Sequence, residues 1–192
     1  MGNVFSDGAA DARYSRVAIW LHWGTALLLL VNLALGFWYD AFGKPAAAWL
    51  MFFHKSIGIS VLFLTCVRLA WRVSHRPPRF DDAMKGWETK LARFVHALFY
   101  LLLIALPATG WMFSSSWGRA SPLFGLVEIA PLPVATSDAA RSLFGNVHEV
   151  LAFLTIALIL MHVAGALKHH LNGHRHLIGR MAPWLAASPG RS

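Results

Sequence analysis

Four long apolar runs constrain this chain more than any other feature of its sequence. They cover about residues 17–38, 49–71, 91–113 and 147–167, each close to the ~20 residues that a helix needs to cross a membrane. The 192 residues are 57% hydrophobic and only 14% charged, which is too apolar for an ordinary soluble domain. We therefore expect an all-α membrane protein, a bundle of four transmembrane helices forming one domain over residues 1–192.

Positive charge is distributed unevenly between the two ends of the predicted helices. The leader, the loop between the second and third runs and the tail are rich in lysine and arginine, whereas the opposite side carries Lys44, Lys55, Arg119 and Arg141. By the positive-inside rule, both termini are expected in the cytoplasm. This topology accounts for the net charge of +8 without nucleic acid as a partner, and it implies contact with membrane lipid.

Histidines occur at two matching depths of the predicted bundle. His148 and His162 are 14 residues apart, which is about 21 Å of helical rise and ~40° short of four whole turns, so they share one face. His54 lies at the depth of His148, and His22 at the depth of His162. Because two imidazoles at one depth can bind the iron of a porphyrin between them, the pairs predict two b-type haems. The single cysteine, Cys66, excludes the C-x-x-C-H attachment of c-type haem.

The ligand at the inner depth is not determined by depth alone. His96, near the inner end of the third run, has nearly the same depth as His22, so both remain candidates to pair with His162. A metal-ion transporter or a proton relay is an alternative to haem. Both usually need buried carboxylates, however, and the only acidic residue near a span is Glu149.

Small residues beside the histidines favour haem over a bare metal ion. A porphyrin needs space next to its ligands that a larger side chain would fill, although small residues also serve close helix packing in membranes. The glycines in question lie two, four and three residues after His22, His54 and His162, and they are Gly24, Gly58 and Gly165.

Five stretches of the sequence carry a family likeness that covers nearly the whole chain. They are RYSRVAIWLHW from Arg13, HKSIGIS from His54, RFVHALFYLLLIALP from Arg93, HEVL from His148 and MHVAGALKHH from Met161. Together they resemble the bacterial cytochrome b561 family, within the wider set of di-haem cytochrome b subunits of hydrogenases and formate dehydrogenases. The resemblance implies a multi-pass protein of the bacterial inner membrane.

The resemblance also implies a ligand set and an activity. It pairs His22 with His162 and His54 with His148, and so leaves His96 without a ligand role. Some bacterial members act as superoxide oxidases, which take an electron from superoxide at the outer face and pass it through both haems to ubiquinone. The alternative is a quinone-linked anchoring subunit of a hydrogenase-type or formate-dehydrogenase-type complex, which passes on electrons from a docked partner.

An anionic donor calls for positive charge near the outer haem, because focused positive potential raises the encounter rate of anions. Lys55 directly follows His54 and is the predicted catalytic cation. Arg119 and Arg141 are further candidates, and their alternative role is plain solvation of an outer loop.

The predicted quinone site lies beyond the inner haem. His169 follows His162 by seven residues, which is two turns along the same helix face, and Lys168 lies beside it. We expect His169 and Lys168 to bind ubiquinone. The alternative for both is a basic tail that interacts with anionic lipid headgroups.

Overall fold

The computed structural model describes residues 14–75, 86–173 and 175–185. The part of the basic leader before residue 14, most of the second loop and the end of the tail lie outside the described residues. The orientation of the bundle in the membrane therefore stays a prediction from the charge pattern.

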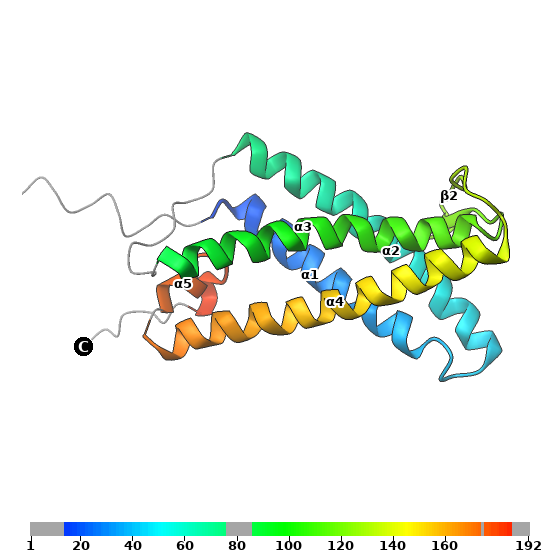
Figure 1. The fold of residues 1–192 in the computed structure, drawn as a ribbon. Helices are drawn as coiled ribbons and strands as arrows, with labels where there is room; N and C mark the ends of the chain where they lie inside the picture. The colour runs from blue at the N-terminus through cyan, green and yellow to red at the C-terminus, as the bar shows by residue number, and fades with distance from the viewer. Residues whose placement is uncertain (1–13, 76–85, 174, 186–192) are drawn as a thin grey trace, which may run out of the picture.

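Four long helices make up most of the described chain, and they are α1 (Arg16–Trp38), α2 (Lys44–Ser74), α3 (Gly86–Ser115) and α4 (Asp138–Leu171) (Figure 1). Each contains one of the predicted apolar runs and is long and apolar enough to cross a membrane. The predicted four-helix membrane bundle is thus confirmed. Two short elements follow α4, namely α5 (Arg175–Gly179) and the 3-10 helix η1 (Pro183–Leu185).

The segment between α3 and α4 is more structured than the loop expected over residues 114–146. It contains a hairpin of β1 (Ser121–Leu123) and β2 (Val127–Ile129), and α4 begins well before its apolar run. Ser137 caps α4 by accepting a hydrogen bond from the Ala140 N–H at 3.2 Å. A cap supplied by a polar residue extends the helix into a stretch that hydropathy alone does not mark.

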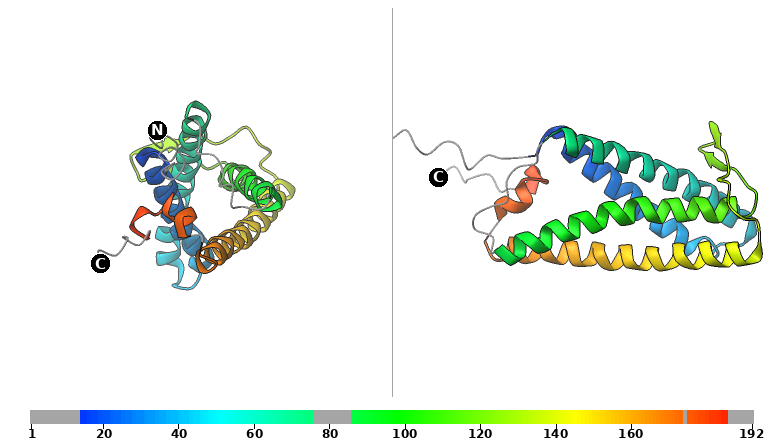
Figure 2. Two further views of the ribbon diagram at one scale, coloured as in Figure 1. Left: turned by 90° about the vertical axis from the view of Figure 1, so that its left-hand side faces the viewer. Right: turned by 45° about the horizontal axis from the view of Figure 1, so that its top comes forward.

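The helices form two closely packed pairs, α1 with α2 and α3 with α4, and α2 also packs on α3. Figure 2 shows α3 and α4 side by side along their length. Among the described residues, α4 makes no comparable backbone approach to α1 or α2. Helix α4 therefore faces α1 and α2 through side chains and not through close backbone packing.

Inward-facing residues recur at seven-residue intervals on all four helices, as in left-handed bundles. The hairpin layer, nearest the β-hairpin, contains Gly36, His54, Gly110 and His148. The middle layer contains Leu29, Val61, Leu103 and Thr155, all buried. The terminal layer contains His22, Arg68, His96 and His162. Successive layers are about 10 Å apart by helical rise.

Polar contacts fix the hairpin across one end of the bundle. Ser56 is fully buried, and its hydroxyl accepts a hydrogen bond from the Phe124 N–H at 3.0 Å. The same hydroxyl donates to the carbonyls of Phe52 and Pro122 at 2.9 and 3.0 Å. Farther along, the Trp111 indole N–H donates to the Ala130 carbonyl at 3.2 Å. The hairpin is thus attached to both α2 and α3.

The opposite end of the bundle is covered by the segment after α4. The Trp23 indole N–H donates to the Met181 carbonyl at 2.8 Å, and the Trp23 and Trp184 rings are 5.6 Å apart. Ala182, which lies between Met181 and Trp184 in the sequence, is 1% exposed. The segment containing α5 and η1 therefore packs against α1 one residue from His22.

We predict that Ser56→Ala destabilises the hairpin end of the protein. The substitution removes part-buried hydrogen bonds to the Phe124 N–H and the Pro122 carbonyl, each worth about 0.5–1.5 kcal/mol of unfolding free energy. Ser60→Ala is the matched control, because the Ser60 hydroxyl donates only to the Ser56 carbonyl of its own helix. Thermal unfolding in detergent measures the difference, and equal melting temperatures for the two variants would contradict the prediction.

Candidate functional site

His54 and His148 meet across the hairpin layer. Their ring centres are 6.1 Å apart and the ring planes are at 89°. Two imidazoles on opposite sides of one metal ion, with metal–nitrogen bonds of about 2 Å, have ring centres about 6 Å apart. They project from α2 and α4, which do not pack together in the described residues, so a porphyrin between them does not compete with a helix contact. The residues present fit a haem with two histidine ligands.

The His54 ring is seated against α1 by a hydrogen bond and a close approach. Its Nδ1 lies 3.0 Å from the Asn32 carbonyl oxygen. The Gly36 backbone, one turn later, lies so close that a Cβ atom there would be 2.8 Å from His54 Cε1. When Nδ1–H donates to the carbonyl, Nε2 is left unprotonated and able to bind a metal.

The His148 ring is seated against α3 in the same way. Its Nδ1 lies 2.9 Å from the Leu106 carbonyl oxygen, and a Cβ atom on Gly110, four residues on, would be 2.8 Å from His148 Cε1. Each histidine of the hairpin layer thus contacts two residues of the neighbouring helix. One supplies the carbonyl near Nδ1, and the other is the glycine four residues after the carbonyl residue. Hydrogen bonds of this kind fix the orientation and tautomer of metal-binding histidines.

A cavity of about 530 Å³ occupies the hairpin layer. Both histidines and both glycines line it, and Lys55, Ser114 and Arg119 line it as well. The Lys55 ammonium donates to the Ser114 hydroxyl at 3.1 Å. The predicted catalytic lysine therefore borders the same cavity as the histidine beside it.

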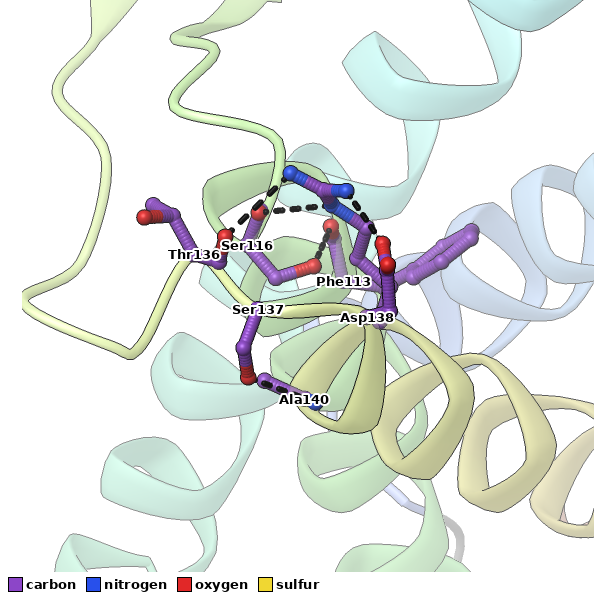
Figure 3. Close-up of polar contacts among 7 residues, drawn as sticks. Phe113, Ser116, Thr136, Ser137, Asp138 and Ala140 are labelled. Atoms are coloured by element: carbon purple, nitrogen blue, oxygen red, sulfur yellow. Dashed lines mark hydrogen bonds and ion pairs between the residues drawn. The ribbon is translucent and has the colours of Figure 1, made fainter.

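Arg141, the third cation predicted for steering, is committed to the loop before α4. Its guanidinium donates to the carbonyls of Ser116 and Thr136, each at 3.2 Å, and to the Asp138 carboxylate at 2.7 Å (Figure 3). It also lies over the Trp117 ring, 4.4 Å from its centre. These contacts show that Arg141 stabilises the loop before α4. Of the three predicted cations, Lys55 and Arg119 line the hairpin-layer cavity.

The terminal layer brings three histidines together. The rings of His96 and His162 are 6.0 Å apart at 62°. His22 Nδ1 lies 3.0 Å from an Arg68 guanidinium nitrogen, whereas His96 Nδ1 is buried and has no hydrogen-bond partner among the described residues. The ring separation of His96 and His162 is close to that of His54 and His148, while depth leaves His22 as a candidate too, so the pairing of His162 with His22 stays a prediction.

The residues predicted for quinone binding lie one heptad beyond the terminal layer. Lys168 forms an ion pair with Glu88 of α3 at 3.1 Å and lies over the Trp87 ring, 5.5 Å from its centre. Lys168 therefore joins α3 to α4. His169, half-buried at the seven-residue position after His162, stays the predicted quinone ligand.

The glycines that seat the histidines differ from those that the sequence singled out. A Cβ atom at Gly24 or Gly165 would meet nothing within 4 Å, and at Gly58 it would meet only the Asn32 amide nitrogen at 3.5 Å. Gly36 and Gly110 were missed because they are distant in sequence from the histidines they contact. Their spacing in the sequence indicates the position, because Gly36 lies 14 residues after His22 and Gly110 lies 14 residues after His96.

Comparisons with known proteins agree with this architecture. Residues 13–184 match the family described as prokaryotic cytochrome b561. Cytochrome b561 homolog 2 of Escherichia coli (strain K12) is 31% identical over 88% of this chain and 90% of its own length. Cytochrome b561 homolog 1 of the same organism is 28% identical over 89% and 97%. A probable superoxide oxidase CybB of Yersinia pestis is 28% identical over 89% and 96%.

We predict that Gly36→Ala and Gly110→Ala each weaken or abolish the low-spin spectrum of the haem at the hairpin layer. A methyl group 2.8 Å from Cε1 must displace an imidazole that is pinned by its carbonyl hydrogen bond. Both variants should therefore resemble His54→Ala and His148→Ala in electron paramagnetic resonance and optical spectra.

Controls for this prediction lie on the same two helices. Gly24→Ala on α1 and Gly86→Ala on α3 add a methyl group where nothing lies within 4 Å, so the spectrum of the hairpin-layer haem should stay unchanged. A normal low-spin signal in both Gly36→Ala and Gly110→Ala would show that these glycines do not position the ligands.

Proposed function

Because the chain belongs to the prokaryotic cytochrome b561 family, we propose that it is a di-haem superoxide:ubiquinone oxidoreductase. Proteins of this family are membrane electron-transfer proteins that bind haem b, and this chain is a multi-pass protein of the bacterial inner membrane. The likeness to a probable superoxide oxidase supports the choice of donor. The finer activity rests on the residues of the two layers.

The facing pair of His54 and His148 carries the proposal, because its 6.1 Å separation is that of two imidazoles on one iron. Haem iron supplies one-electron chemistry when it is bound there. The protein's proposed part is to leave both Nε2 atoms unprotonated for the iron, which the contacts of the Nδ1 atoms with the Asn32 and Leu106 carbonyls favour.

For the second haem, helix packing favours His22 over His96 as the partner of His162. A haem held by two histidines would need room between their helices, and α3 packs closely on α4. By contrast, α1, the helix of His22, does not pack closely on α4 in the described residues. The two helices meet at the hairpin end, where the rings of Phe37 and Phe153 are in contact. The His22 pair, like the His54 pair, thus joins two helices that do not pack closely on each other in the described residues.

The proposed reaction has two half-reactions at opposite ends of the bundle. Superoxide loses one electron and leaves as dioxygen, and ubiquinone takes up two electrons and two protons, so two superoxide ions are oxidised for each quinone. Lys55 and Arg119 border the hairpin-layer cavity and attract the anion. His169 is proposed to hydrogen-bond a quinone carbonyl beyond the terminal layer, because its ring nitrogens can donate and accept hydrogen bonds.

We predict that His22→Ala loses one low-spin haem, whereas His96→Ala retains both. The reason is the helix separation described above. Pyridine haemochrome quantification together with electron paramagnetic resonance counts the haems and their spin states. The reverse outcome would assign the ligand to α3 and reject the His22 pairing.

We predict that superoxide reduces the purified protein in a reaction that slows as salt is added. The Debye length falls from about 30 Å at 0.01 M to about 10 Å at 0.1 M ionic strength, which screens the cations at the cavity. Stopped-flow measurement should give a lower second-order rate for Lys55→Glu. Lys44→Glu, at an exposed lysine of the same end, should have a smaller effect.

The quinone half-reaction is separable in the same assay. His169→Ala should leave reduction by superoxide intact and slow the reoxidation of the protein by added ubiquinone. If superoxide does not reduce the protein faster than it dismutates, the oxidase activity is rejected. The anchoring-subunit function, with a docked protein as electron donor, then becomes the better assignment.

A further inference from the structure

Arg68 occupies the position in the terminal layer that corresponds to His54 in the hairpin layer. The two residues are 14 apart on α2, the same interval that separates His148 from His162 on α4. Arg68 therefore lies on the face of α2 that carries His54 and at the depth of the histidines of the terminal layer. An arginine at this depth of a membrane bundle needs a reason, because charged side chains inside the membrane are costly.

The contacts of Arg68 are with neutral groups. Its guanidinium carbon lies 5.5 Å from the centre of the Tyr100 ring, and one guanidinium nitrogen lies 3.0 Å from His22 Nδ1. Arg72, one turn farther along α2, lies over the same ring at 5.8 Å. Two guanidinium groups thus flank one tyrosine at the edge of the terminal layer.

Neither arginine has a carboxylate partner in the part of the chain that the structure describes. Asp40, Glu128, Asp138 and Glu149 lie toward the hairpin end, and Glu88 is paired with Lys168. A half-buried cation without a counter-ion is unfavourable, so a site of this kind is completed by an anionic ligand. The planar fork of guanidinium matches a carboxylate or a phosphate through two parallel hydrogen bonds.

We infer that Arg68 and Arg72, arranged against Tyr100, bind the propionate carboxylates of the haem in the terminal layer. The inference rests on the proposed second haem. It holds for either candidate ligand, since Tyr100 lies one turn after His96 and Arg68 touches His22.

The same assignment resolves a conflict at His22. A ring nitrogen that accepts a hydrogen bond from a guanidinium leaves the proton on the other nitrogen, and a protonated nitrogen does not bind iron. A carboxylate is a stronger acceptor for guanidinium than a neutral imidazole is, because the bond is then charged on both sides. Binding of a propionate therefore draws Arg68 away from His22 Nδ1 and leaves the ring free to adopt the tautomer of a ligand.

The test compares Arg68→Gln, Arg68→Lys and Arg16→Gln in the haem-loaded protein. Arg16 is an exposed cation at the same end of the bundle, so its loss controls for net charge. Redox-difference infrared spectra with ¹³C-labelled haem propionates report the carboxylates directly, and optical titration reports both midpoint potentials. We expect Arg68→Gln to shift the labelled carboxylate bands and to lower one midpoint potential. Arg16→Gln should change neither.

A charged quinone oxygen and a lipid phosphate are other anions that this pair of arginines could bind. Quinone-free protein distinguishes the first from a propionate, and unshifted bands of the labelled carboxylates in Arg68→Gln distinguish the second. An effect of Arg68→Gln that appears only after ubiquinone is added would overturn the propionate assignment. If Arg68→Gln does not fold, Arg68→Lys decides, because replacing the fork by an ammonium should still shift the carboxylate bands. Two haems with unshifted bands reject this inference alone, whereas a wild-type protein with a single haem rejects the proposed second haem itself.

Discussion

The seven-residue interval between inward-facing positions is the constraint on which the rest of this structure depends. It keeps one face of every helix toward the bundle axis over three successive layers. Because all four helices share it, a residue type placed at one level meets residues of the same level on its neighbours. The buried middle layer of Leu29, Val61, Leu103 and Thr155 supplies the core, and the chemically active side chains lie two turns to either side of it.

The middle layer also determines which kind of charge can cross the bundle. It has no titratable side chain, and the Thr155 hydroxyl donates to the Leu151 carbonyl of its own helix at 2.7 Å. No chain of hydrogen-bonding groups therefore links the hairpin layer to the terminal layer through these four positions. At these four positions the layer offers no titratable group to a proton relay. This property agrees with the electron-transfer role of the family.

Much of the fold was predictable because hydropathy and helical rise are local properties of the sequence. The four spans and the shared depth of His54 with His148 follow from counting residues, and both appear in the structure. The seats at Gly36 and Gly110 depend on how neighbouring helices are rotated, which no single helix reveals. Similarly, Arg141 has the charge of a steering cation, but the Ser116 carbonyl, 25 residues before it, becomes its hydrogen-bond partner only when the loop folds.

The two ends of the bundle are built differently, in a way that suits two different reactants. At the hairpin end, Ser56, Trp111 and Arg141 fix the segment between α3 and α4, so Lys55 and Arg119 border the cavity in a preorganised arrangement. Fixed cations are effective for a small diffusing anion, because no reorganisation is needed when it arrives. The terminal end is closed by a short segment attached through Trp23. Fewer tertiary contacts make a segment easier to displace locally. This difference bears on the proposed activity, because a bulky lipid-soluble quinone requires such displacement at its entry, whereas superoxide does not.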